Sequence, residues 1–211
     1  MKAKLLATAL MFAAAALTPC AAPDATAATD NAAAKVGQPA PALKLVDSTG
    51  NTRSLAEFAG KTVVLEWTNH ECPFVKKHYG AGNMQAQQRD ATADGVVWLS
   101  INSSAPGKQG HVDGDGAERI RGQARAAQTA YLLDPSGTAG RAYGAKTTPH
   151  MYVIDPKGVL RYAGAIDSIP SSDTADIKKA TQYVPQALAQ LAAGQPVSDT
   201  VTRPYGCSVK Y

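Results

Sequence analysis

One cysteine, Cys72, stands directly before a proline and a helix-like segment, in the stretch N-H-E-C-P-F-V-K-K-H-Y at 69–79. A thiol attacks another molecule as its thiolate, and a free thiol is mostly protonated at neutral pH. A helix N-terminus offers unpaired N–H groups and a partial positive charge, which favour the anion. Pro73 suits the first helical position, because its missing N–H is not needed there. The pattern predicts a reactive thiolate at Cys72; an inert buried cysteine is the alternative.

A second sulfur is needed if Cys72 takes part in thiol–disulfide exchange. The position three residues on, where a C-x-x-C pair would place it, is Val75. The closing segment P-Y-G-C supplies Cys207, and Gly206 permits a sharp backbone bend beside it. We expect Cys207 to be the resolving thiol, which requires Cα atoms within about 7 Å. A free tail thiol or an intermolecular bond is the alternative.

Glu66 is the one charged residue in the apolar run T-V-V-L-E-W-T at 62–68. A carboxylate inside a buried strand is costly unless it is paired or protonated. Two interpretations follow. Glu66 is either a proton acceptor behind the thiol, and so a candidate catalytic residue, or a strand-end residue that points to water.

The histidines at 70, 78, 111 and 150 raise a metal hypothesis for Cys72, since copper and zinc bind sulfur and imidazole ligands. However, His78 lies six residues after Cys72, and a helix would turn it well away. A second cysteine four residues on, as in copper carriers with C-x-x-x-C, is replaced by Lys76. We therefore expect no metal and no other cofactor.

The elements that must position Cys72 alternate between strand and helix. Buried strands are expected at 62–68 and 96–101, with a helix at 73–93 between them that is imperfect around Gly80 and Gly82. The other expected elements are strands at 42–46, 131–133, 151–155 and 159–164, the last two joined by a D-P-K-G hairpin, and helices at 54–58, 117–128, 138–143 and 177–193. This order predicts an α/β fold with a mixed central sheet and helices on both faces.

The N-terminus has the order of a secretory signal peptide. Lys2 and Lys4 precede an uncharged apolar run at 5–17, which small residues follow. We expect a signal peptide at 1–22, cleaved between 22 and 28, a flexible leader at 23–36, a domain at 37–194 and a tail at 195–211 that carries Cys207. A buried helix is the alternative for the apolar run. Lipidation of Cys20 is a further alternative, although Pro19 departs from the small residue expected there.

Composition narrows the class of protein. The chain has 211 residues, 45% of them hydrophobic, which is enough for one domain with a sizeable core. The net charge is +4 and no dense block of basic residues is present, so we expect no nucleic-acid partner. Cleavage near residue 28 would leave only Cys72 and Cys207, which are natural candidates for pairing in an exported chain. We expect a periplasmic protein, in contact with a membrane only if it is lipidated at Cys20.

Three segments resemble the thioredoxin superfamily, over roughly residues 37–194: W-T-N-H-E-C-P-F-V, T-T-P-H-M-Y-V-I-D and the D-P-K-G hairpin. V-G-Q-P-A-P followed by S-L-A-E-F-A-G-K-T-V-V-L resembles the opening of its peroxiredoxin and thiol-reductase branch. C-P-F-V-K-K-H-Y with G-C-S-V-K-Y is most similar to the peroxiredoxin-like, redoxin-type group related to AhpC/TSA proteins. The resemblance implies a thioredoxin-like fold and a cis-proline at Pro149, after Thr148, opposite Cys72, where backbone pairs with substrate; an ordinary turn proline is the alternative.

The departures from that group shape the functional prediction. Peroxiredoxins carry P-x-x-x-[T/S]-x-x-C, but Asn69 and Leu65 replace the hydroxyl residue and the proline here. We expect a thiol oxidoreductase with Cys72 as nucleophile. It either reduces a peroxide, with a sulfenic acid that condenses with Cys207, or attacks a protein disulfide.

The expected partners are a protein or small-molecule thiol or disulfide, or a peroxide, together with an external thiol reductant. The competing class is a non-catalytic thioredoxin-fold module, which binds a partner through the Pro149 face or carries copper.

Overall fold

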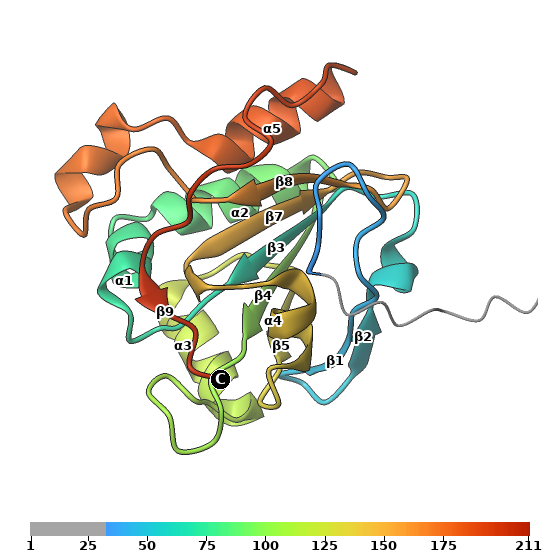
Figure 1. Ribbon diagram of the computed structural model, residues 1–211. Helices are drawn as coiled ribbons and strands as arrows, with labels where there is room; N and C mark the ends of the chain where they lie inside the picture. The colour runs from blue at the N-terminus through green and yellow to red at the C-terminus, as the bar shows by residue number, and fades with distance from the viewer. Residues whose placement is uncertain (1–32) are drawn as a thin grey trace, which may run out of the picture. The chain divides into compact units, whose positions relative to one another are not determined.

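The computed structural model describes residues 33–211, which belong to one compact unit (Figure 1). The predicted signal peptide, Cys20 and most of the predicted leader lie outside the described residues. Within the described range, no helix has the length and apolar character needed to cross a membrane.

A mixed seven-stranded sheet forms the centre of this unit, in the order β2-β1-β5-β4-β3-β7-β8. Strand β3 (Val63–Trp67) runs parallel to β4 (Val97–Asn102) and antiparallel to β7 (His150–Ile154). The flanking strands are β1 (Lys44–Asp47), β2 (Thr52–Ser54), β5 (Ala130–Leu133) and β8 (Leu160–Gly164). All residues of β3 are buried, as expected for an apolar, β-branched strand covered on both faces. The predicted fold class is confirmed.

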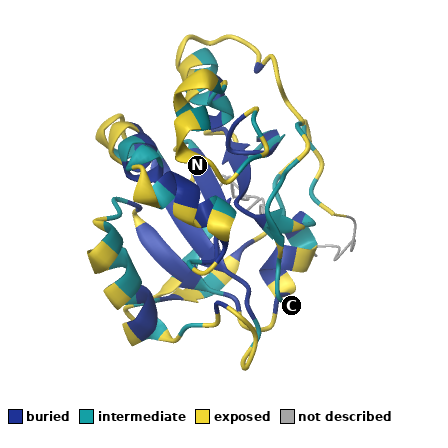
Figure 2. Ribbon diagram, turned by 90° about the vertical axis from the view of Figure 1, so that its left-hand side faces the viewer, coloured by how far each residue is buried: buried dark blue, intermediate teal, exposed yellow. Residues whose placement is uncertain are grey.

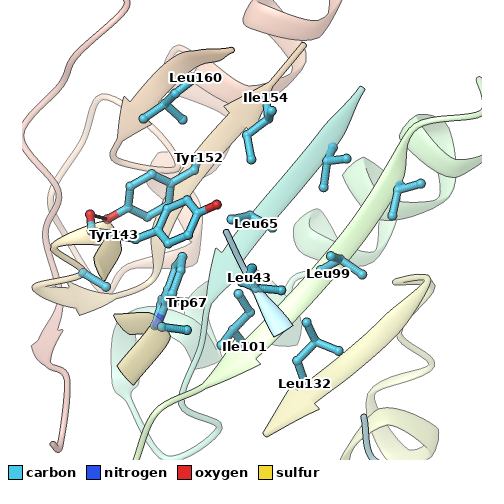
Figure 3. Close-up of a cluster of buried hydrophobic side chains, with 14 of the residues drawn as sticks. Leu43, Leu65, Trp67, Leu99, Ile101, Leu132, Tyr143, Tyr152, Ile154 and Leu160 are labelled. Atoms are coloured by element: carbon cyan, nitrogen blue, oxygen red, sulfur yellow. Dashed lines mark hydrogen bonds between the residues drawn. The ribbon is translucent and has the colours of Figure 1, made fainter. Parts of the chain in front are cut away.

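Side chains of β3 alternate between two hydrophobic cores, one on each face of the sheet. Leu65 and Trp67 belong to the first core, where Trp67 packs with Tyr143 and Tyr152 at ring-centroid distances of 5.3 and 5.1 Å (Figure 3). Val64 points to the second core. The aromatic cluster thus lies beneath the strand end from which the chain continues towards Cys72.

Helices cover both faces of the sheet. Helices α1 (Pro73–Gly80), α2 (Asn83–Ala93) and α5 (Tyr183–Ala192) pack on the side of the second core. Helix α4 (Thr138–Tyr143) and the 3-10 helix η1 (Leu55–Phe58) pack on the first. Helix α3 (Gly114–Ala124) lies beside β5, and a second 3-10 helix, η2 (Thr174–Lys179), precedes α5. Figure 2 shows the central strands buried and the helices exposed on their outer sides.

Two predicted helices have different bounds in the structure. The helix expected at 117–128 starts earlier, at Gly114, because the Asp113 side chain accepts a hydrogen bond from the Gly116 N–H (2.8 Å). It ends at Ala124, since Arg125 adopts a left-handed conformation (φ 50°). The irregularity expected near 80–82 separates α1 from α2.

The prediction of a single helix at 177–193 is wrong. Residues 174–179 form η2, and α5 begins only at Tyr183. Tertiary hydrogen bonds draw the chain out of the helix between them: the Ser168 N–H donates to the Thr181 carbonyl (3.1 Å) and the Tyr183 N–H to the Ile166 carbonyl (3.2 Å). The apolar spacing that predicted the helix belongs to α5 alone.

The tail is ordered, which the sequence pattern did not predict. Strand β9 (Cys207–Ser208) pairs antiparallel with β6 (Thr147–Thr148) in a separate two-stranded sheet. Beyond it, the Val209 N–H donates to the Lys146 carbonyl (3.1 Å) and the Tyr211 hydroxyl to the Ala145 carbonyl (2.8 Å). These contacts bring the end of the chain back to the residues just before β6.

Candidate active site

Cys72 occupies the N-cap of α1, with extended backbone and Pro73 as the first helical residue. The preceding turn is closed by a hydrogen bond from the Cys72 N–H to the Asn69 carbonyl (3.0 Å) and by one from the Glu71 N–H to the Asn69 side-chain oxygen (2.9 Å). The Cys72 side chain has no exposed surface. The helix start is therefore built as the sequence predicts, and the thiol is covered.

The Thr148–Pro149 segment is what covers the thiol on one side. The peptide bond between these residues is cis, as the family resemblance implies. The Cys72 Sγ donates a hydrogen bond to the Thr148 carbonyl oxygen (3.0 Å). The Thr148 hydroxyl is buried without a hydrogen-bond partner of its own. An unused donor thus lies in the residue that the sulfur contacts.

Cys207 joins the same site through β9. Its register partner in β6 is Thr148, the residue whose carbonyl contacts Cys72. Both cysteines are free thiols, and they lie close enough for each to shift the pKa of the other. The structure therefore brings together three of the predicted site residues, Cys72, Thr148 and Cys207, with Pro149 adjacent.

The surroundings of the two thiols shift their pKa values in opposite directions. Burial raises the pKa of Cys72, but the neighbouring Cys207 thiol and the Val75 N–H lower it by more, so the pKa of Cys72 lies below that of an ordinary thiol. The pKa of Cys207 is raised to about 11, by burial and by the neighbouring Cys72. The two shifts favour ionisation of Cys72 before Cys207.

Gly206 allows the tail to approach this closely. Its φ of 135° is one that L side chains rarely adopt. A methyl group on Gly206 would overlap with the Thr148 carbonyl oxygen. Glycine is thus required at this position on both conformational and steric grounds.

A buried polar network holds the tail against α1. The Lys77 ammonium group pairs with the Asp167 carboxylate (3.1 Å), and neither side chain is exposed. The Tyr205 hydroxyl donates to the same carboxylate, and Tyr205 packs edge-on against Phe74 with ring centroids 5.7 Å apart. His78 Nε2 lies 3.3 Å from the Tyr205 hydroxyl. In Figure 1 the tail (red) runs past α1 to β9, and Tyr205 fixes it two residues before Cys207.

Sequence reasoning missed this network. Lys77 follows Lys76 in the helix expected at 73–93, and Asp167 lies in a loop 90 residues further along the chain. Only the packing of the tail on α1 brings them together, so no local spacing signals it.

Glu66 forms a hydrogen-bond network that does not include Cys72. Its carboxylate is fully buried and accepts hydrogen bonds from four neutral donors, Tyr79, Gln88, Trp98 and Ser100, at 2.8 to 3.2 Å. Burial raises its pKa above the ordinary carboxyl value, against the lowering effect of these donors. The strand-end interpretation is wrong, because the side chain has no contact with water. No hydrogen bond joins Glu66 to Cys72 among the described residues.

The histidines lie in separate surroundings. His78 belongs to the tail network, His150 Nδ1 lies 3.1 Å from the Tyr152 hydroxyl, and His111 Nδ1 lies 2.9 Å from the Ser104 carbonyl oxygen. In residues 33–211, no three His, Cys, Asp or Glu side chains are grouped in a way that could hold a metal ion. The copper-carrier alternative therefore has no ligand group in this part of the chain.

A strand, a Cys-Pro helix start and a facing cis-proline define a thioredoxin-like protein. The AhpC/TSA family matches residues 36–163, and the chain belongs to that family. No curated protein matches the chain. Family and fold together support a thiol oxidoreductase.

Solved structures with this fold have low sequence identity to the chain. An uncharacterized conserved protein from Geobacillus kaustophilus is 24% identical, with a TM-score of 0.71 over 84% of this chain and 92% of that one. A hypothetical protein from Sinorhizobium meliloti is also 24% identical, with a TM-score of 0.71 over 85% and 96%. A protein assigned as the thiol:disulfide interchange protein DsbE from Chlorobium tepidum is 24% identical, with a TM-score of 0.51 over 62% and 85%. These likenesses show the fold.

Proposed function

We propose that the protein is an exported thiol–disulfide oxidoreductase in which Cys72 is the nucleophile and Cys207 the resolving thiol. One observation carries the proposal: β9 pairs Cys207 with Thr148, the residue whose carbonyl contacts the Cys72 sulfur, and the two thiols have opposite pKa shifts. A low-pKa thiol is the attacking and the leaving group of exchange, whereas its partner completes the internal disulfide. Pro149 and Thr148 are proposed to border the bound substrate.

In disulfide exchange, the Cys72 thiolate attacks one sulfur of a substrate disulfide and releases the other substrate sulfur as a thiolate. Cys207 then loses its proton and attacks Cys72 in the mixed disulfide, which releases the second substrate thiolate. The substrate gains two electrons, and the protein is left with a Cys72–Cys207 disulfide. An external thiol reductant, two thiols per cycle, restores the dithiol and leaves as its own disulfide.

Peroxide reduction is a second candidate, favoured by membership of the AhpC/TSA family. Cys72 would take one peroxide oxygen to become a sulfenic acid, with release of an alcohol or water. Cys207 would then displace hydroxide from that sulfur, giving water and the same disulfide. Asn69 weakens this candidate, because its side chain is engaged by the Glu71 N–H and the Gln109 carbonyl and brings no hydroxyl to Cys72.

Access to Cys72 requires the tail to move. The thiol has no exposed surface under the tail and the Thr148 segment, whereas Cys207 is half-buried. We place the substrate-reactive state in the fraction of molecules whose tail has left β6. The docked tail is then the state in which Cys207 meets Cys72.

Export to the periplasm is part of the proposal. It is supported by the charged, apolar, then small-residue order of residues 1–28 and by a mature chain with two cysteines. The mass of the mature protein from a bacterial periplasm separates cleavage near residue 28 from a lipid-modified Cys20. A mature chain that retains residue 2 would contradict export.

The deciding experiment is disulfide mapping after oxidation. The protein is treated with one equivalent of a small disulfide or of hydrogen peroxide and digested, and its cysteine peptides are identified by mass spectrometry. We expect a Cys72–Cys207 peptide pair in the monomer. A Cys207→Ser variant should stop at a mixed disulfide or sulfenic acid on Cys72. Cys72 unmodified by either oxidant would contradict the proposal and favour the binding module.

A further inference from the structure

A cleft of about 410 Å³ opens between α1 and α3, away from the tail. Its walls come from both helices, from Thr68 after β3, and from Tyr131 in β5. The volume lies at the lower end of the range of roughly 300–1,000 Å³ that is usual for small-molecule sites. Val75 and Lys76, three and four residues after Cys72, line it from the helix face that Cys72 also occupies.

Buried polar atoms without a partner are concentrated in this cleft. Native structures satisfy nearly all such atoms, so each exception needs an explanation. In residues 33–211 there are six, and four belong to residues that line the cleft: His70 Nδ1, Gln85 Oε1, Arg121 Nε and Gln128 Oε1. Gln85 and Gln128 are themselves more than nine-tenths buried, with exposed fractions of 8% and 3%. Two acceptors and a guanidinium donor without partners therefore belong to residues that line one cleft.

The orientation of Gln85 is fixed by its own contacts. Its amide nitrogen donates to the Tyr79 carbonyl (2.9 Å) and to the Ala124 carbonyl (2.8 Å). A flip of the amide would set its oxygen against two carbonyl oxygens, so the assignment is unambiguous. The Gln85 oxygen therefore remains a free acceptor on a residue that lines the cleft.

The charge of the lining has one sign. Lys76 and Arg121 line the cleft, and no aspartate or glutamate does. Arg121 is paired through one guanidinium nitrogen with Glu118 (3.0 Å), which lies outside the lining and leaves Nε without a partner. Charged residues of this kind favour a carboxylate at the rim. Val75 and Ile120 add apolar surface to the lining of the cleft.

We propose that this cleft binds a small zwitterion of the amino-acid or short-peptide type. Ligand N–H groups donate to the Gln85 and Gln128 oxygens, the ligand carboxylate accepts from Lys76 and Arg121, and an apolar side chain lies against Ile120. The site is distinct from the Cys72–Cys207 pair and does not depend on the redox proposal. It adds a ligand class that thiol chemistry alone does not imply.

The test uses the dipeptide leucylglycine as probe, with amide chemical shifts of the labelled full chain followed by NMR. We expect saturable shifts at residues that line the cleft. Leucylglycine methyl ester, which lacks the carboxylate, should bind at least about tenfold more weakly, since it loses the charge-assisted hydrogen bonds to Lys76 and Arg121. Absence of saturable shifts at the solubility limit of the dipeptide, or equal binding of the ester, would overturn the proposal.

A matched pair of variants on α3 locates the contact. Arg121→Gln should weaken leucylglycine binding about tenfold, whereas Arg119→Gln, an exposed arginine outside the lining, should leave it unchanged. Equal effects of the two variants would place the dipeptide elsewhere and overturn the assignment. Both variants should form the Cys72–Cys207 disulfide as the wild type does, so a failure of this site is separable from a failure of the redox proposal.

Discussion

The start of α1 and the tail strand β9 each contribute one thiol to the same site, yet they treat it differently. At Cys72, a helix N-cap and several donors favour the thiolate and lower its pKa. At Cys207, a short strand supplies no comparable set of donors, and burial together with the neighbouring thiol raises its pKa to about 11. Two identical side chains in contact thereby acquire different roles.

The two regions also differ in what holds them. The helix start is local: Pro73, the Asn69 turn and the first turn of α1 form it within a dozen residues. The tail is held by distant partners, Thr148 through β6 and Asp167 through Tyr205. The nucleophile is therefore set by a rigid element, whereas the position of its resolving partner depends on contacts that single substitutions can release.

The largest expected effect is on disulfide reduction, in which substitutions of the two thiols should block different steps. Cys72→Ser should abolish reduction of a model disulfide, a loss on the order of a thousandfold or more, because the nucleophile itself is removed. Cys207→Ser should still undergo one attack and stop at the mixed disulfide. Stopped-flow release of the first substrate thiol distinguishes them. Equal first-step rates in both variants would break the assignment of roles.

Acid should lower the free energy of unfolding through His78, a member of the polar network that holds the tail. Burial lowers the pKa of His78 to about 4, from an ordinary 6.5, with Lys77 adding to the lowering and Asp167 opposing it. The unfolded chain therefore binds a proton that the folded chain rejects, so stability falls as pH falls from about 6.5 to 4. The shift corresponds to about 3 kcal/mol.

Denaturant unfolding at several pH values measures this effect. His78→Gln should flatten the fall in the free energy of unfolding over that window by about the same amount, on the order of 3 kcal/mol. His111→Gln, at an exposed histidine, is the matched control and should retain the wild-type slope. An unchanged slope in His78→Gln would remove His78 from the account of acid sensitivity.

Gly206→Ala should release the tail while leaving the helix start intact. The strained φ and the overlap with the Thr148 carbonyl cost about 1–3 kcal/mol in the docked state. The population of undocked molecules should rise about 10- to 100-fold, and alkylation of Cys72 should accelerate in proportion. Gly194→Ala, a positive-φ glycine with open space around it, controls for backbone strain elsewhere. Equal acceleration in both variants would contradict the proposed role of the tail.

The smallest expected effect comes from Tyr205→Phe. It deletes the hydroxyl that donates to Asp167 and keeps the ring packed on Phe74, at a cost of about 1–2 kcal/mol. Alkylation of Cys72 should rise about tenfold. Tyr183→Phe, on α5 and outside the tail network, is the control. No change in Tyr205→Phe would show that β6–β9 pairing alone holds the tail.

The sequence predicts the start of α1, which is built from local contacts, better than the tail, which distant residues hold in place. Cys72 and Pro73 can be interpreted from the helix start itself, and the cis bond at Pro149 from the family resemblance. The count of cysteines in the mature chain points to Cys207, but the sequence carries no signal for β9. The Lys77–Asp167 pair has no signal in the sequence, because burial of a lysine depends on which distant segment covers it.

For the fold as well, elements set by local sequence pattern are predicted better than those set by distant contacts. Strands with continuous apolar runs, such as β3, and the hairpin between β7 and β8 follow from local pattern. The break between η2 and α5 does not, since hydrogen bonds to residues 166 and 168 override a periodicity that reads as one helix. The sequence also leaves the role of Glu66 open, because the four donors that surround it come from α1, α2 and β4.

The most direct test of the account is an NMR titration of the cysteine Cβ carbons in the reduced protein, with signals assigned from Cys72→Ser and Cys207→Ser. The account predicts that Cys72 ionises below the pH of an ordinary thiol and Cys207 near pH 11. Ionisation of Cys72 at or above the ordinary thiol value, or of both sulfurs together, would contradict it.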